Sequence, residues 1–189
     1  MYIDPIRYSG RPADGTGRIP QELAIYDRLD QLSIPFDRVD HEHADTMEIC
    51  QEVEKVLGDQ ICKNLFLCNR QQTQFYLLMM PGDKPFKTKY LSAQLGCSRL
   101  SFADAGHMEE YLHTIPGSVS ALELLFDAQG KVQLVIDRPL LAGDTISGHP
   151  GISTSTLRMR REDLLNYVAA VGHSPIYVDL PDPRETGEA

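Results

Sequence analysis

The 189-residue sequence contains no tryptophan and only four cysteines, which are Cys50, Cys62, Cys68 and Cys97. None of them forms a CxxC pair, so neither a zinc ribbon nor a thioredoxin-like redox site is indicated. Cys62 and Cys68 lie in a strongly apolar run, where a free thiol behaves as a small hydrophobic group. We therefore expect reduced cysteines that help to fill a core.

Long hydrophobic runs are also missing. No apolar stretch approaches the roughly 20 residues that a bilayer-spanning helix needs. The N-terminal segment MYIDPIRYSGRPADGTG lacks the basic and then apolar regions of a secretory signal. GxGxxG and P-loop motifs are absent, so no nucleotide cofactor is expected. These absences favour a cytoplasmic enzyme or binding module that uses no cofactor and no membrane.

Positive charge is scarce. The sequence has 18 Lys and Arg but 27 Asp and Glu, which gives a formal net charge of −9. This balance argues against a broad electrostatic grip on nucleic acid, although it allows local contact with phosphate. Two short basic clusters are present, Lys84, Lys87 and Lys89 in one and Arg158, Arg160 and Arg161 in the other. Each is expected to be a solvated surface. Any bound nucleic acid would be held over a small area, such as one end of an RNA.

Helix and strand patterns alternate along one domain at residues 20–180, after an irregular lead-in at 1–19 and before a polar tail at 181–189. Apolar periodicity predicts helices at 20–32, 46–57, 90–96, 104–113 and 162–171. Strands are predicted at 36–40, 61–68, 75–80, 98–102, 122–126, 131–136, 152–159 and 175–180. The strands 122–126 and 131–136 flank the turn DAQG and are predicted to pair as a hairpin. Asp45 and Glu48 resemble a capping box, and Gly58 and Gly96 are expected helix stops. The mixture indicates an α/β or α+β fold with a mixed sheet.

The run from Ile61 to Cys68 has the pattern of a strand buried on both faces, interrupted by Lys63 and Asn64. A buried ammonium group is unfavourable unless it is paired, which favours a functional explanation for Lys63. The alternative is that Lys63 lies at the strand entrance with its ammonium group in water. The residue pattern leaves both interpretations open.

Two loop segments could also carry chemistry. In PGSVSA, Gly117, Ser118 and Ser120 could form a tight loop whose backbone groups approach a ligand, or an ordinary connection. No GxSxG elbow is present to activate either serine. In the second segment, Gly148 and Pro150 flank His149, whose imidazole could bind phosphate or a ribose hydroxyl, act as acid or base, or simply belong to a turn.

His41 and His43 are not expected to bind a metal. They are two residues apart, and no matching cluster of Cys, His or Asp accompanies them. A solvated strand end explains the pair better, and no metal site is predicted elsewhere.

Together these segments resemble the family of YbaK and the aminoacyl-tRNA synthetase-associated editing domains. The resemblance is strongest to the prolyl-tRNA deacylase branch, and it covers about residues 20–180. It rests on the order and spacing of DHEHADTMEIC, CKNLFL, PGSVSALELLFD and GHPGISTSTLRM. It implies a mixed, partly barrel-like sheet surrounded by helices.

The resemblance also implies roles for residues. Lys63 matches the family's strand lysine, which would anchor the 3′-terminal phosphate or the substrate, and Asn64 would help to place the aminoacyl end. The segment from Gly117 through Ser118 and Ser120 matches a Gly-x-x-x-Pro loop whose backbone holds the attacking water, with Ala121 at the proline position. His149, between Gly148 and Pro150, falls on the family's His-Pro loop, and His41 on a histidine near the site entrance.

The activity so implied is hydrolysis of the ester between a wrong amino acid and tRNA, with alanyl-tRNA(Pro) as the expected substrate. The acceptor end of the aminoacylated tRNA would be the partner, with prolyl-tRNA synthetase as a second candidate partner. Two alternatives stay open. One is the same hydrolase acting on cysteine, serine or threonine, and the other is a non-catalytic module that binds tRNA or a synthetase.

Overall fold

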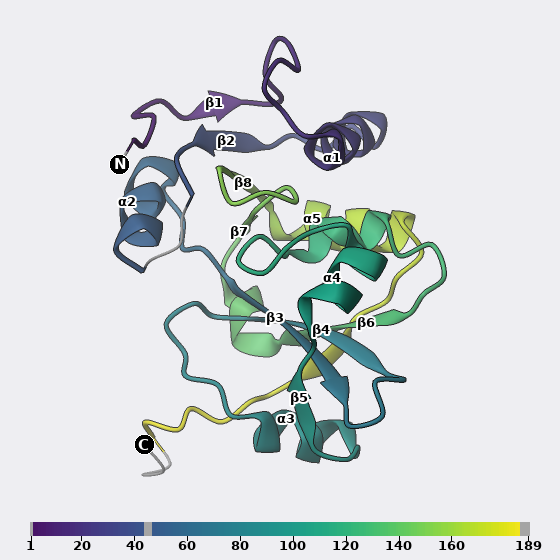
Figure 1. Ribbon diagram of the computed structural model, residues 1–189. Coiled ribbons are helices and arrows are strands. Elements are labelled where there is room, and N and C mark those ends of the chain that lie inside the picture. The colour runs from purple at the N-terminus through teal and green to yellow at the C-terminus, as the bar shows by residue number, and fades with distance from the viewer. Residues whose placement is uncertain (1, 44–46, 186–189) are drawn as a thin grey trace.

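The computed structural model describes residues 2–43 and 47–185, which build two β-sheets with five α-helices around them (Figure 1). The larger sheet has the strand order β5-β3-β4-β6-β9. Its strands are β3 (Lys63–Asn69), β4 (Phe75–Met80), β5 (Leu100–Phe102), β6 (Val132–Asp137) and β9 (Ile176–Val178). β3 is antiparallel to β4 and β5, whereas β4, β6 and β9 run parallel, so the sheet is mixed.

The smaller sheet has the order β1-β2-β8-β7 and is antiparallel throughout. Its strands are β1 (Tyr8–Ser9), β2 (Asp37–Asp40), β7 (Thr145–Gly148) and β8 (Ser155–Arg160). A parallel bridge between Ile61 and Ser147 joins the approach to β3 with β7. The two sheets therefore meet where β3 begins.

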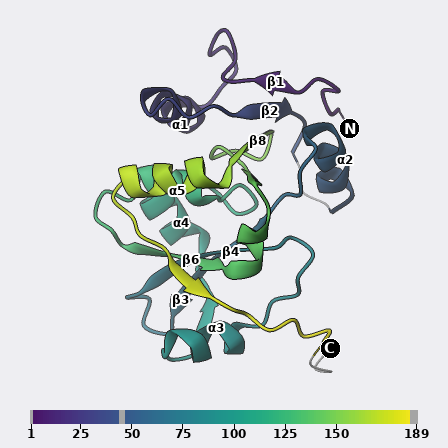
Figure 2. The same cartoon turned by 180° about the vertical axis from the view of Figure 1, so that it is seen from behind.

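Helices cover the sheets on several sides, as Figures 1 and 2 show from opposite directions. They are α1 (Pro20–Gln31), α2 (Met47–Leu57), α3 (Thr88–Leu95), α4 (Ala105–Leu112) and α5 (Arg161–Ala170), with 3-10 turns η1 (Ala121–Leu125) and η2 (Arg138–Ala142). Among the described residues, no helix has the length and apolar character needed to cross a bilayer.

Two faces of the larger sheet pack into different apolar clusters, because alternate side chains of a strand point to opposite faces. Phe66, Leu77 and Leu134 join the main core beside α1, α4 and α5. Leu67 and Leu78 instead contact a second cluster that includes residues of α3. The strand β3 is thus apolar on both faces, as its sequence predicts. Because both faces are packed, the strand holds its first two residues, Lys63 and Asn64, in place.

The predicted mixed α/β class is confirmed, but neither sheet closes into a barrel among the described residues. The five predicted helices and the strand 61–68 are present with shifted ends, and the strand 75–80 is present as predicted. Gly58 and Gly96 follow helices with positive φ of 73° and 62°, as helix stops commonly do. The capping box predicted at Asp45 lies outside the described residues.

The predicted hairpin of 122–126 with 131–136 is wrong. Residues 121–125 form the 3-10 turn η1, and β6 pairs in parallel with β4 and β9 instead. The physical reason is local, because Ser120 and Glu123 form a capping box that starts a helical turn. The surface position expected for Lys84 is also wrong, since its side chain is buried against Asp137. β1, β7 and η2 had no counterpart in the sequence-based prediction.

Candidate functional site

A cavity of about 310 Å³ lies where the two sheets meet. It is lined by Cys50, Gln51, Glu54, Gln60, Ile61, Cys62, Lys63, Asn64, Gly82, Asp83, Gly117, Val119 and His149. These residues come from α2, the start of β3, the loop after β4, the loop before η1 and the end of β7. Segments far apart in the sequence therefore converge on one space.

Lys63 is the first residue of β3, and it is half-buried. Its ammonium group donates a hydrogen bond of 2.9 Å to the carbonyl oxygen of Lys84. Burial lowers the pKa of Lys63, while the nearby Asp83 raises it and Arg184 lowers it further. Lys63 therefore lies at the strand entrance and lines the cavity, with its ammonium group bonded to a backbone carbonyl.

Asn64 follows on the opposite face of the strand. Its Nδ2 donates weakly to the carbonyl oxygen of Cys62 at 3.4 Å and to the Cys62 Sγ at 3.5 Å. Its Oδ1 is buried and accepts no hydrogen bond within the described part of the chain. Buried polar atoms without a partner are rare and often mark a functional position.

The loop before η1 presents Gly117 and Val119 to the cavity. Gly117 has φ +88°, a left-handed conformation that residues with a Cβ rarely adopt. The neighbouring Ser118 is buried and lines a separate hollow on the other side of the loop. Its N–H donates to the Ile115 carbonyl oxygen, which makes the loop a closed turn.

Ser120 and Glu123 hold this loop to the histidine loop. The Ser120 hydroxyl donates to the carbonyl oxygen of His149 at 2.7 Å and accepts from the N–H of Leu122. The Ser120 N–H donates to the carboxyl group of Glu123. Glu123 is fully buried, which raises its pKa well above its usual range, and the backbone N–H of Gly151 also donates to it. One capping box thus fixes both loops.

His149 contributes an imidazole whose protonation the fold sets. Its Nδ1 lies 2.9 Å from the carbonyl oxygen of Ser155, which can only accept, so Nδ1 carries the proton. Burial and, to a smaller extent, the nearby His41 lower the pKa of His149 to about 4, although the hydrogen bond to Ser155 acts in the opposite direction. Near neutral pH the ring is therefore uncharged, with an acceptor lone pair on Nε2.

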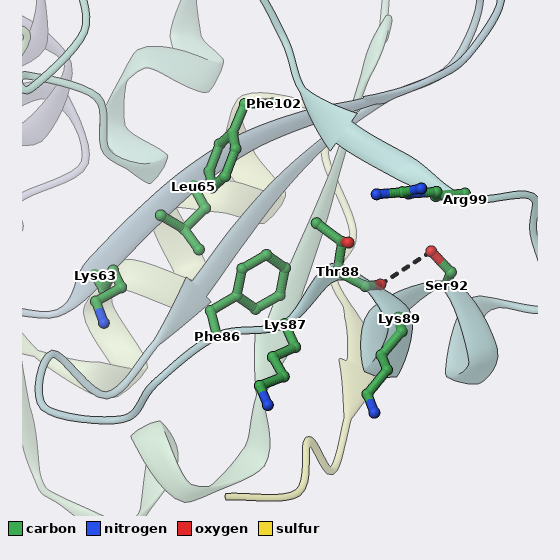
Figure 3. Close-up of a pocket in the computed structure, with 9 residues that line it drawn as sticks. All are labelled: Lys63, Leu65, Phe86, Lys87, Thr88, Lys89, Ser92, Arg99 and Phe102. Atoms are coloured by element: carbon green, nitrogen blue, oxygen red, sulfur yellow. Dashed lines mark hydrogen bonds between the residues drawn. The ribbon is translucent and has the colours of Figure 1, made fainter. Parts of the chain in front are cut away.

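A second, larger cavity of about 950 Å³ adjoins the first, and Lys63 lines both. Its lining is Lys63, Leu65, Phe86, Lys87, Thr88, Lys89, Ser92, Arg99 and Phe102, and we call it the basic groove. Figure 3 shows Lys63 and Arg99 at opposite ends, with Leu65 and Phe86 between them. Four of these residues are basic and none is acidic, in a chain whose net charge is −9.

The groove also exposes aromatic surface. Phe102 is 62% exposed, and its ring meets that of Phe86 edge to face at 6.4 Å between centroids. A cationic groove with exposed rings is a common arrangement for unpaired nucleotides, because bases stack on the rings while phosphates meet the charges. Among the described residues, no group of three His, Cys, Asp or Glu is arranged to hold a metal ion.

Comparison with known proteins agrees with this geometry. Residues 41–167 match the model of the aminoacyl-tRNA editing domain. The chain belongs to this family. The match begins directly after β2, ends within α5 and so contains every residue that lines the first cavity.

Individual relatives are similar over most of their lengths. The prolyl-tRNA editing protein ProX of Acetoanaerobium sticklandii is 30% identical over 83% of this chain and 96% of its own. The mouse protein named prolyl-tRNA synthetase associated domain-containing protein 1 is 31% identical over 81% of this chain and 92% of its own. A solved structure described as a candidate trans-editing enzyme for prolyl-tRNA synthetase shares the fold, with a TM-score of 0.63 at 16% identity, covering 86% of this chain and 97% of its own.

In this editing domain the residues singled out from sequence divide into two groups. Lys63, Asn64, Gly117 and His149 line the cavity. The others do not, and they are His41, Ser118, Ser120, Gly148 and Pro150. Ser120 and Gly148 instead line a narrow apolar hollow beside the cavity, and Pro150 is buried.

Sequence reasoning missed Glu123, Gly82 and Asp83. The spacing Ser120-x-x-Glu123 is a capping-box signal that could have revealed Glu123. A Cβ on Gly82 would clash with the Ile61 carbonyl oxygen, and this close approach between distant segments leaves no local pattern.

Proposed function

We propose that this editing domain is a free-standing aminoacyl-tRNA deacylase that removes alanine from alanyl-tRNA(Pro). The observation that carries the proposal is the position of Lys63, which lines both the enclosed cavity and the basic groove. The groove suits a short, single-stranded RNA end, and the cavity suits the aminoacyl group attached to it. The names of its relatives, which refer to prolyl-tRNA editing, support the choice of tRNA.

The proposed reaction is hydrolysis of an ester. Water adds to the acyl carbon, the bond from that carbon to the ribose oxygen breaks, and the ribose oxygen takes up a proton. Lys63 contributes positive charge near the 3′ end, while Asn64 supplies an amide to orient the aminoacyl group. The backbone at Gly117 and Val119 and the acceptor Nε2 of His149 border the space where water would attack. Positioning and fixed dipoles can account for much of such a rate enhancement.

Ala121, at the proline position of the family loop, does not leave this segment unsupported. Ala121 is the first residue of η1 and is buried, and the capping box of Ser120 and Glu123 precedes and encloses it. This support favours an active enzyme over a non-catalytic tRNA-binding module. In the proposal the reaction takes place in the cytoplasm, where charged tRNA is used.

The decisive experiment is a deacylation panel. The protein is incubated with alanyl-, cysteinyl-, seryl-, threonyl- and prolyl-tRNA(Pro), and loss of each ester is followed with time. Fast loss of alanine alone is expected. Equal loss of alanine and proline would overturn the specificity, and fastest loss of another amino acid would reassign the substrate. Tight tRNA binding without any deacylation would favour the non-catalytic module.

Lys63 is tested in the same assay. Lys63→Ala is expected to lower kcat/KM by about a hundredfold, the scale of losing one preorganised electrostatic contact. Lys131→Ala is the matched control, because Lys131 is an exposed lysine that lines neither cavity. Full activity of Lys63→Ala would show that the charge of Lys63 is not needed for deacylation.

A further inference from the structure

Lys84 lies in the loop between β4 and α3, and its ammonium group is buried in an ion pair. The Lys84 Nζ is 2.7 Å from the Asp137 Oδ2, and the two side chains are 9% and 0% exposed. Burying two charges is unfavourable unless they are paired and their remaining hydrogen bonds are satisfied. An exposed lysine would avoid this desolvation, so the buried position calls for an explanation.

The backbone of Leu180, just beyond β9, completes the pair. The Lys84 ammonium donates to the Leu180 carbonyl oxygen, and the Leu180 N–H donates to the Asp137 Oδ1 at 2.9 Å. Asp137 ends β6, so three segments meet at one buried polar cluster. Figure 2 shows the chain after β9 running past α3, and two hydrogen bonds between Gln94 and Asp179 hold it there.

The same loop residue orients Lys63. The carbonyl oxygen of Lys84 accepts the hydrogen bond from the Lys63 ammonium group at 2.9 Å. Gly82, two residues earlier, is so close to the Ile61 carbonyl oxygen that a Cβ would clash there. The loop is therefore held against the start of β3 at Gly82 and against β6 and the C-terminal segment at Lys84.

We infer that Lys84 is a positioning residue, which acts through Lys63 and is itself fixed by Asp137 and Leu180. This inference rests on the proposed function, because the role of Lys63 does. In it, the buried ion pair sets where the Lys84 carbonyl lies, and this carbonyl sets the direction of the Lys63 ammonium group between the cavity and the basic groove. The C-terminal segment thereby becomes part of the support of the site.

A double-mutant cycle tests the coupling. Lys84→Met is expected to lower kcat/KM about ten- to hundredfold, since a displacement of about 1 Å can have that effect. In a Lys63→Ala background, Lys84→Met is expected to have no further effect, because residues acting through one another are not additive. A full additional loss in that background would show a merely structural role and overturn the inference.

Two further variants keep the test decisive. Lys84→Met alone leaves a buried carboxylate, so Lys84→Met/Asp137→Leu is measured in the same cycle if the single variant does not fold. Arg18→Met is the control, because Arg18 forms a partly buried pair with Asp40 and lines neither cavity. It is expected to lower Tm while kcat/KM stays unchanged. Wild-type kcat/KM in the paired variant would contradict the inference.

A readout without tRNA separates this inference from the proposed function. The lysines are reductively methylated with ¹³C, Lys63 is assigned with Lys63→Arg, and its titration is followed by NMR in wild type and Asp137→Asn. Loss of the Asp137 charge alone would lower the pKa of Lys63, whereas loosening of the loop relieves burial and raises it. A raised pKa is expected, and an unchanged or lowered one would overturn the positioning. If no tRNA is deacylated, the proposed function fails while this result still stands.

Discussion

His41 and His149 lie on either side of Thr156, with ring centroids 6.0 Å apart and ring planes at 57°. His41 Nδ1 lies 2.7 Å from the carbonyl oxygen of Glu42 and therefore donates, so its Nε2 accepts from the Thr156 hydroxyl at 2.8 Å. The Thr156 oxygen lies 3.3 Å from the proton-bearing Nδ1 of His149. His41 thus contacts His149 through Thr156 and does not line the cavity, and because it is buried, the solvated strand end expected for it is wrong.

The first prediction concerns pH, because the fold holds His149 neutral. Its pKa falls from the ordinary value of 6.5 to about 4. The free energy of unfolding is therefore unaffected by the titration of His149 above about pH 6.5. It decreases as the pH falls from 6.5 toward 4, because the unfolded chain then binds a proton at His149 that the folded chain excludes. Between about pH 7.5 and 5 the loss should be on the order of 2 kcal/mol, at ~1.4 kcal/mol per pKa unit.

Urea unfolding of wild type and of His149→Gln at these two pH values checks this prediction. His41, whose pKa burial lowers from 6.5, contributes an acid sensitivity of the same sign to both proteins, whereas that of Asp40 begins only near its ordinary pKa of 3.8. The difference between them therefore isolates His149. An equal loss of stability in both proteins would show that His149 keeps its ordinary pKa in the folded chain and is not held neutral by the fold.

The second prediction separates strain from function at Gly117. Gly117→Ala should lower stability by roughly 1–2 kcal/mol, because a Cβ is disfavoured at positive φ, and should also lower kcat by shifting the loop. Gly96→Ala is the matched control, since Gly96 also has positive φ and open space around it but ends α3. Chemical unfolding and deacylation rates are measured for both. Equal kinetic effects would contradict the role of the Gly117 loop.

The third prediction concerns Phe102 in the basic groove. Phe102→Ala should weaken binding of a tRNA acceptor-stem hairpin about tenfold, since stacking on one ring contributes ~1–3 kcal/mol. Stability should change little because the ring is mostly exposed. Ile115→Ala removes a similarly exposed apolar side chain outside the groove and should leave binding unchanged. Fluorescence anisotropy measures the affinity of both variants for the hairpin. Equal affinities of Phe102→Ala and Ile115→Ala would show that the groove does not bind the RNA.

The fourth prediction concerns Arg99, at the far end of the groove. Arg99→Ala should reduce the slope of log affinity against log salt concentration by ~0.7, the value for one phosphate contact on a single strand. The measurement is binding of the same hairpin over a series of salt concentrations. A slope equal to that of wild type would show that Arg99 meets no phosphate.

The fifth prediction concerns the capping box. Ser120→Ala should destabilise the protein by about 1–2 kcal/mol, because it removes a cap and a buried hydrogen bond to the His149 carbonyl. It should also lower kcat, since it releases the contact between the two loops. Thermal unfolding and kinetics measure the two effects. Unchanged stability would mean that Ser120 does not join the loops as its hydrogen bonds indicate.

Local sequence patterns determined much of this molecule. The apolar run from Ile61 to Cys68 predicted β3, because a strand buried on both faces needs apolar residues throughout. In such a run the polar side chains of Lys63 and Asn64 are exceptions. Gly58 and Gly96 ended helices, since glycine adopts positive φ readily. The resemblance of four ordered motifs indicated the editing family, which the comparisons show.

Tertiary structure decided what distance along the chain conceals. The burial of Lys84 depends on Asp137, 53 residues away, and on Leu180, 96 residues away, so its sequence neighbours suggested only a basic surface. The parallel pairing of β6 likewise depends on β4 and β9 rather than on the adjacent turn. The periodicity of a sequence indicates which face of a helix or strand is apolar. Which residue a buried charge pairs with, and which strand lies beside another, depend on how remote segments pack together.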